Sequence, residues 1–219
     1  MKKVVKIIAL VAVAAAVVCL VVINIVGSST PETDEVWDEH TMIGKTDAAH
    51  HYVLYTDLSC GYCYRLSSIL VENSNELEKI LNEKDIKLEF RIIPYLSSDI
   101  SLWGAEAMAC AADEERFFEY FSLVIPTLGV DYFESDGSAK IDADYFADLG
   151  ARMGMSDKFV SCVKNHEKSS AVAEMEKKAG RRIASSSGVP YLKFGKYTSG
   201  GFDSSWGWAK VQQMLEAGL

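Results

Sequence analysis

Residues 51–63 read HYVLYTDLSCGYC, and this stretch decides the fold that the sequence predicts. Residues 51–56 are rich in β-branched and aromatic side chains, which is typical of a strand. Over residues 64–81 apolar side chains recur at helical spacing, and residues 86–94 alternate as in a second strand. A strand, a helix and a strand in this order predict two parallel strands joined by a right-handed crossover. The two cysteines of CGYC therefore lie where the first strand ends and the helix begins.

The remainder of the chain is predicted to be a helical block followed by a hairpin and a last helix. Five segments within residues 98–186 have helical patterns and are separated by breakers: 99–112, 114–124, 142–153, 156–166 and 168–186. The turn Gly195-Lys196 separates two expected strands at 191–194 and 197–202, and residues 204–216 form an amphipathic helix. We therefore expect an α/β fold in which an all-helical domain is inserted into a small sheet.

Cys60 and Cys63 form a Cys-x-x-Cys motif at the predicted amino terminus of a helix. The backbone N–H groups and the positive end of the helix dipole at this position favour a thiolate over a thiol. Because the thiolate attacks in disulfide exchange, we predict Cys60 as the nucleophile and Cys63 as the resolving thiol. Gly61 and Tyr62 lie between them and shape the motif. Asp57, three residues before Cys60, either influences the pKa of Cys60 or caps the preceding turn, and we favour the cap. A structural zinc site is the alternative, but it ordinarily needs a second Cys pair or paired His residues, so we expect no metal and no other cofactor.

Residues 1–26 have the pattern of a membrane span. Lysines precede an apolar run over residues 7–26, which is close to the roughly 20 residues that a helix needs to cross a bilayer. We predict an uncleaved signal anchor, and a cleaved signal peptide with a shorter apolar region is the alternative. Cys19 is interpreted as an apolar residue of this helix. By the positive-inside rule, the amino terminus is cytoplasmic and the chain from Gly27 onward lies outside the cytoplasm.

Residues 27–47 are rich in Ser, Thr and acidic side chains, which predicts a flexible tether before a domain over 48–219. Three of the chain's 22 Lys and Arg residues precede the apolar run, whereas all 31 Asp and Glu residues follow it. The part outside the membrane therefore has a net charge of −12. This balance disfavours a nucleic-acid partner.

Gly188-Val189-Pro190 stands immediately before the expected hairpin, where a proline is tolerated at a strand's start. With CGYC and the helical insertion, this loop makes residues 50–219 resemble the DsbA-like branch of the thioredoxin superfamily. The resemblance implies a thiol–disulfide oxidoreductase whose only redox group is its own cysteine pair. It also implies a cis Val189–Pro190 bond facing the motif. The Val189 backbone would pair with an extended substrate peptide beside Cys60, a form of strand addition.

The chain differs in different ways from the DsbA proteins, from the DsbC isomerases and from the thioredoxins. Strongly oxidising DsbA proteins often have Pro-His between the cysteines, whereas Gly61-Tyr62 resembles the DsbC isomerases. Those isomerases have a dimerisation domain and a Thr before the cis-proline, and this chain has only the tether and Val189. The buried acid that thioredoxins have six residues before the first cysteine is replaced by Leu54. The separation of 125 residues between Cys63 and Gly188 favours the DsbA-like insertion over the shorter DsbC one.

Cys110 and Cys162 both lie in predicted helices of the insertion. Some DsbA-like proteins have a second disulfide there, and an oxidising compartment favours pairing of two such thiols. We expect a structural disulfide rather than a second redox centre, because neither residue belongs to a Cys-x-x-Cys motif. Two buried, unpaired cysteines are the alternative.

The sequence thus predicts an oxidoreductase anchored in the cell membrane, with its catalytic domain in the periplasm or at the cell surface. Its expected role is to introduce disulfides into reduced or unfolded secreted proteins. A membrane redox partner, such as a quinone-linked reoxidant, would then restore the Cys60–Cys63 disulfide. An isomerase or reductase is the first alternative, favoured by Gly61-Tyr62, and a chaperone-like binding module without turnover is the second. Four aromatic side chains are candidates to line an apolar groove for the substrate: Tyr62, Tyr64, Trp103 and Tyr191.

Overall fold

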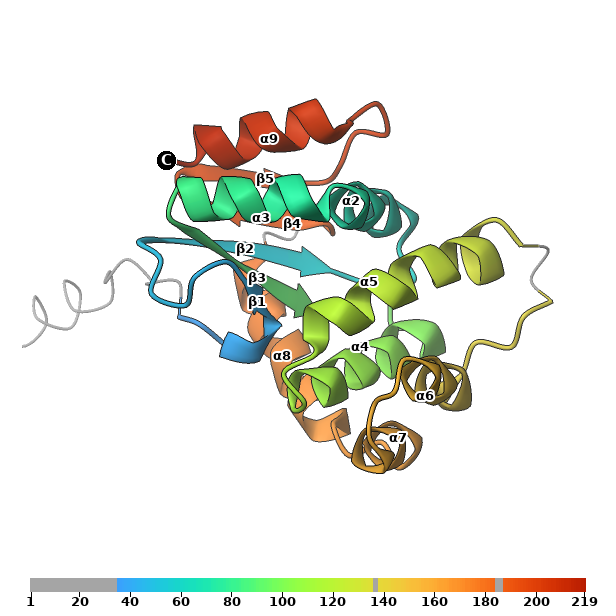
Figure 1. Cartoon of the computed structure of the whole chain (residues 1–219). Coiled ribbons are helices and arrows are strands. Elements are labelled where there is room, and N and C mark those ends of the chain that lie inside the picture. Colours follow the sequence, from blue (N-terminus) through green and yellow to red (C-terminus); the bar gives the residue numbers. More distant parts are fainter. Residues whose placement is uncertain (1–34, 136–137, 184–186) are drawn as a thin grey trace, which may run out of the picture. The chain divides into compact units, whose positions relative to one another are not determined.

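The computed structural model describes residues 35–135, 138–183 and 187–219. Within them, five strands form one mixed sheet in the order β1-β3-β2-β4-β5 (Figure 1). The strands are β1 (Met42–Ile43), β2 (His50–Thr56), β3 (Ile86–Ile92), β4 (Tyr191–Phe194) and β5 (Tyr197–Gly200). β2 and β3 are parallel, with Leu54 opposite Phe90, as the strand–helix–strand pattern predicted. β4 runs antiparallel to β2 and pairs with β5 in the expected hairpin.

The helices fall into a group on the sheet and a group in the insertion. The first group is α2 (Gly61–Glu72), α3 (Ser74–Glu83) and α9 (Trp208–Ala217). The second is α4 (Asp99–Ala112), α5 (Phe117–Leu128), α6 (Ala143–Arg152), α7 (Asp157–Lys164) and α8 (Ser169–Arg182), with the short helix η2 (Gly129–Phe133). The helical turn η1 (Glu39–Thr41) belongs to neither group and precedes β1. The predicted inserted helical domain in an α/β fold is therefore present.

One face of the sheet is apolar and belongs to the main core. Because side chains alternate along a strand, every second residue of β2, β3 and β4 points to this face. α3 contacts β3 and α9 contacts β4 from the same side (Figure 1). The Tyr52 hydroxyl donates to the Leu215 carbonyl of α9 at 3.0 Å, which ties this helix to the central strand. The buried side chains of this face are Tyr52, Leu54, Leu88, Phe90, Ile92, Leu192 and Phe194.

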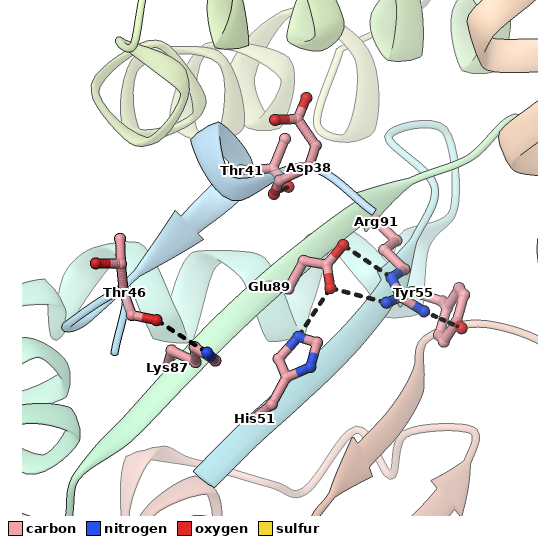
Figure 2. A network of polar contacts seen from close by, with 8 residues as sticks. All are labelled: Asp38, Thr41, Thr46, His51, Tyr55, Lys87, Glu89 and Arg91. Atoms are coloured by element: carbon pink, nitrogen blue, oxygen red, sulfur yellow. Dashed lines mark hydrogen bonds and ion pairs between the residues drawn. The ribbon is translucent and has the colours of Figure 1, made fainter. Parts of the chain in front are cut away.

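The opposite face of β2 and β3 carries a buried polar network (Figure 2). Both carboxylate oxygens of Glu89 accept from Arg91, at 3.0 Å from Nε and 2.8 Å from the second guanidinium nitrogen. His51 Nε2 lies 2.8 Å from the same carboxylate, and Arg91 also donates to the Tyr55 hydroxyl at 2.6 Å. Glu89 and Arg91 are almost fully buried, so their charges must compensate one another. The Tyr55 ring lies 5.9 Å from that of Tyr191, the first residue of β4.

A disulfide between Cys110 of α4 and Cys162 of α7 cross-links the insertion, with an S–S distance of 2.00 Å. The two cysteines are separated by 52 residues, and closing a loop of that length stabilises a fold by about 4 kcal/mol in the chain-entropy model. Glu106, one turn before Cys110, pairs with His166 at 2.6 Å, so a second contact joins the same two parts of the insertion.

The helical run predicted over residues 64–81 is two helices, which begin earlier than expected and are divided at Asn73. The Asn73 side chain donates to the Ile69 carbonyl at 2.8 Å. Asparagine competes with the helix in this way because its short amide can bond to nearby backbone. The apolar periodicity continues across the break, which is why spacing alone did not reveal it.

The predicted tether over residues 27–47 is too long, because its last part belongs to the sheet. Met42 and Ile43 form edge strand β1, antiparallel to β3 and opposite Glu89 and Leu88. Gly44 follows with φ +93°, and a side chain there would collide with the Ile86 carbonyl. The folded unit therefore begins at Asp38 rather than at residue 48.

Two further helix boundaries differ from the prediction for local reasons. The helix expected from residue 114 begins at Phe117, because Glu115 has φ +56° and cannot be part of a right-handed helix. Pro126 was expected to lie beyond the end of this helix, yet it lies within the last turns of α5. Its missing N–H removes a single backbone hydrogen bond there. The last helix begins at Trp208 rather than 204, since Asp203 accepts from the Ser205 N–H at 2.8 Å and forms a turn.

No helix in the described ranges is both long and apolar enough to cross a membrane. The span predicted over residues 1–26 and the first part of the tether lie outside the described residues.

Replacing Glu89 by Gln is expected to destabilise the fold by about 3–5 kcal/mol, because it removes the carboxylate that accepts two hydrogen bonds from the buried Arg91 guanidinium. Urea unfolding measures this loss. The matched control is Glu83→Gln, which removes the carboxylate of the exposed Lys79–Glu83 pair and should change the free energy of unfolding very little. A Glu89→Gln variant as stable as the control would contradict this account of the network.

Candidate redox site

Cys60 is the N-cap residue of α2, immediately after the turn that ends β2. Its backbone is extended, with φ −87° and ψ 121°, and its carbonyl accepts from the Tyr64 N–H at 2.8 Å, which starts the helix. The sulfur therefore lies at the end of a helix whose first N–H groups have no partner within it. The predicted position at the strand–helix junction is the observed one.

The pKa of Cys60 is lowered to about 6. The largest cause is a hydrogen bond from the Cys63 thiol, and the backbone N–H groups of Cys63 and Tyr62 act in the same direction. Burial opposes the shift, as does the negative charge of Asp57. At pH 7 most of the reduced protein would therefore carry a Cys60 thiolate, the species that attacks a disulfide.

The two cysteines have opposite electrostatic surroundings. Burial raises the pKa of Cys63 well above its usual range, and the neighbouring Cys60 adds to the rise. Both cysteines are buried, and the exposed fraction is 8% for Cys60 and 1% for Cys63, so the first is the less deeply buried of the two. Both thiols are free in this structure. This asymmetry suits a nucleophile and a resolving thiol in the order that the sequence predicted.

The loop of Gly188, Val189 and Pro190 faces Cys60. The Val189–Pro190 bond is cis, as the family resemblance implied, and Gly188 has φ +66°. Cys60 Sγ lies 3.7 Å from the Val189 carbonyl oxygen, within reach of a thiol hydrogen bond. The antiparallel pairing of β2 and β4 causes this proximity, because it places Tyr55 opposite Tyr191 at the edge where β2 ends. Two motifs more than 120 residues apart in the sequence thus form one site.

The aromatic residues proposed for a groove have different roles. Tyr62 is 56% exposed inside the motif. Tyr64 instead stacks on Phe133 at 4.4 Å between ring centroids, which packs α2 against η2. Trp103 is half-buried against the core, and Tyr191 packs on Tyr55. Only Tyr62 of the four is placed to meet a partner at the cysteines without rearrangement.

Sequence reasoning missed a polar cluster beside the motif. The buried Asp57 carboxylate and the hydroxyls of Ser59, Ser98 and Ser101 are mutually hydrogen bonded immediately before Cys60. The interpretation of Asp57 as a turn cap is compatible with its bond from the Ser59 N–H at 2.8 Å. The serines at positions 98 and 101, at the start of a predicted helix, were the sequence signal from which the other members of the cluster could have been found.

Among the described residues, no group of three or more His, Cys, Asp or Glu side chains is arranged to hold a metal ion. The site is built from two cysteines, helix N–H groups and a cis-proline loop. This combination of fold and site defines the thioredoxin class of dithiol proteins.

The sequence model of a family described as thioredoxin matches residues 37–213, and the chain belongs to that family. No curated protein matches the chain. Solved structures with the same fold include MdbA, a thiol-disulfide oxidoreductase from Corynebacterium diphtheriae (19% identity, 83% of this chain and 90% of that one, TM-score 0.57). Oxidised BdbD from Bacillus subtilis is similar over 82% of this chain and 92% of that one (16% identity, TM-score 0.58). The thiol-disulfide exchange protein alpha-DsbA2 from Wolbachia pipientis is similar over 80% and 85% (18% identity, TM-score 0.58).

Alkylation of the reduced protein by iodoacetamide is expected to accelerate between pH 5 and pH 7, with a midpoint near pH 6, as Cys60 ionises. Replacing Cys63 by Ala removes the main hydrogen bond to the thiolate, so the midpoint should rise toward the roughly 8.5 of an ordinary thiol. Cys63→Ser keeps a donor and should give a value between the two. A midpoint near 8.5 in the unmodified protein would refute the thiolate assignment.

Proposed function

We propose that this chain is an extracytoplasmic thiol–disulfide oxidoreductase that introduces disulfides into secreted or surface proteins. The observation that carries the proposal is the low-pKa Cys60 at a helix amino terminus, with its sulfur 3.7 Å from the Val189 carbonyl oxygen of the cis-proline loop. A stabilised thiolate favours the reduced form of the enzyme, and an enzyme with a stabilised reduced form is a strong oxidant of its substrates.

In the proposed reaction, a substrate thiolate attacks the Cys60 sulfur of the Cys60–Cys63 disulfide. A substrate–Cys60 disulfide forms, and Cys63 leaves as a thiolate that takes up a proton. A second substrate thiolate then attacks the substrate's own sulfur in the mixed disulfide, and Cys60 leaves as the stable thiolate. The substrate loses two electrons and its two thiol protons. One proton goes to Cys63 and the other to solvent, and the enzyme ends reduced, with a Cys63 thiol and a Cys60 thiolate.

The surroundings of Cys60 suit an unfolded polypeptide as the substrate. Several of the large apolar side chains that are exposed among the described residues belong to segments beside the motif: Tyr62, Tyr95, Leu96 and Leu102. Exposed apolar side chains that lie close together commonly mark interaction sites. The Val189 carbonyl is available to an extended chain once the Cys60 thiol no longer donates to it.

The amino-terminal sequence supports the proposed location and redox partner. A membrane anchor over residues 1–26 would hold the domain near a membrane-embedded reoxidant, which would accept the two electrons and restore the Cys60–Cys63 disulfide. The disulfide between Cys110 and Cys162 supports an oxidising compartment, because such bonds are rare in the cytosol.

An isomerase or reductase is the second candidate, and the motif residues Gly61-Tyr62 favour it. An enzyme that introduces disulfides and a reductase differ in redox potential, because a reductase must have a more stable disulfide than its substrates. A non-catalytic chaperone on the same fold would keep its function in a Cys60→Ser variant.

Equilibration of the full-length chain in detergent with a glutathione series measures the potential of the Cys60–Cys63 pair. Alkylation and mass mapping follow these two cysteines separately from Cys110 and Cys162. We expect a value near −120 mV, at the oxidising end of the known range. A value near −270 mV, that of thioredoxin, would contradict disulfide donation and favour the reductase. Loss of activity in Cys60→Ser separates both enzymes from the chaperone.

A further inference from the structure

Asp57 is a buried carboxylate, with none of its surface exposed, three residues before Cys60. Its oxygens accept from the Ser59 N–H at 2.8 Å, from the Leu96 N–H at 2.7 Å and from the Ser101 hydroxyl at 2.8 Å. These donors come from three separate segments: the turn before the motif, the loop after β3, and the first turn of α4. None of the ion pairs of the described residues involves Asp57. Neutral dipoles alone therefore compensate its charge, although a buried charge is ordinarily paired.

Ser59, Ser98 and Ser101 form a hydrogen-bonded cluster with the Asp57 carboxylate. The Ser59 hydroxyl lies 2.7 Å from that of Ser101, and the Ser98 hydroxyl lies 3.0 Å from Ser59 and 2.8 Å from Ser101. Ser98 also accepts the Ser101 N–H and so caps α4. The residue directly before Cys60 is thereby fastened to the first helix of the insertion.

The charge of Asp57 acts on Cys60 in the direction opposite to the helix. The carboxylate raises the pKa of the Cys60 thiol, whereas the Cys63 thiol and the first N–H groups of α2 lower it. A negative charge beside a thiolate destabilises the reduced form of the pair and so weakens it as an oxidant. The same carboxylate fixes the turn that presents the sulfur.

We propose that Asp57 is a positioning residue that holds the Cys60 turn against α4 and, through its charge, limits how strongly the cysteine pair oxidises its substrates. The inference rests on the proposed thiol–disulfide chemistry at Cys60, but not on the direction of electron flow. The loop of Tyr95 and Leu96 is held to the redox centre by the same carboxylate, since the Leu96 N–H is one of its four donors.

Asp57→Asn in the full-length chain is the direct test, because asparagine keeps the size and one acceptor oxygen and removes the charge. Two quantities are measured: the apparent pKa of Cys60 by alkylation, and the equilibrium of the pair with glutathione. We expect the pKa to fall and the equilibrium to move about three- to tenfold toward the dithiol. A tenfold change corresponds to about 30 mV.

Two further variants separate charge from structure. Asp99→Asn removes the same charge from an exposed position in the first turn of α4, and should leave both quantities unchanged. Ser101→Ala keeps the charge of Asp57 but removes a dipole that compensates it, so the pKa of Cys60 should rise by a measurable amount. Because the two cluster variants act in opposite directions, a general loosening of the site cannot imitate the result.

The outcomes also distinguish this inference from the proposed function. If the unmodified chain exchanges with glutathione while Asp57→Asn and Ser101→Ala both match it, Asp57 has only a structural role and the inference is wrong. If the unmodified chain does not exchange at all, the proposed function fails. Should Asp57→Asn not fold, the rise expected for Ser101→Ala still decides the question, and an unchanged or lowered pKa overturns the proposal.

Discussion

The position of Cys60 at the amino terminus of α2 is the constraint on which the rest of the site depends. It arises only if β2 ends just before the motif and the chain turns into a helix whose first N–H groups have no partner within the helix. The parallel pairing of β2 and β3 requires such a crossover helix, and the antiparallel β4 brings the Val189 carbonyl to the same edge. The sheet therefore positions both halves of the site, and the insertion supports it through α4.

The two thiols differ in how far each is buried. Leu54 points to the apolar face of the sheet, at the position where the family resemblance places the buried acid of thioredoxins. The Glu89–Arg91 pair lies on the opposite face, and Asp57 lies in the turn before the motif. Burial and the neighbouring Cys60 raise the pKa of Cys63 and keep it protonated, whereas the pKa of Cys60 is lowered. The two thiols differ in ionisation because of where the chain places its few buried dipoles and charges.

Much of this arrangement could be predicted from the sequence, because the patterns involved are local. Strand composition, helical spacing and the position of CGYC between them predicted the nucleophile. The loop facing the motif was implied by the resemblance to DsbA-like proteins. The features that could not be predicted depend on interactions between segments that are distant in the sequence. Edge strand β1 is only two residues long and depends on β3 for its formation, so residues 42–43 resembled a tether. The Asp57 cluster joins residues about 40 positions apart, and no spacing rule connects them.

In the reaction proposed above, Cys60 is the cysteine that forms the mixed disulfide with exported proteins, and Cys63 is the buried partner that it leaves and rejoins. To test this, the full-length Cys63→Ser variant is expressed in cells and its covalent adducts are separated under non-reducing conditions. We expect a mixed disulfide between Cys60 and exported proteins, which reductant releases and which is absent from the double variant with Cys60→Ser. Adducts that persist without Cys60, or that contain only cytoplasmic proteins, would contradict it.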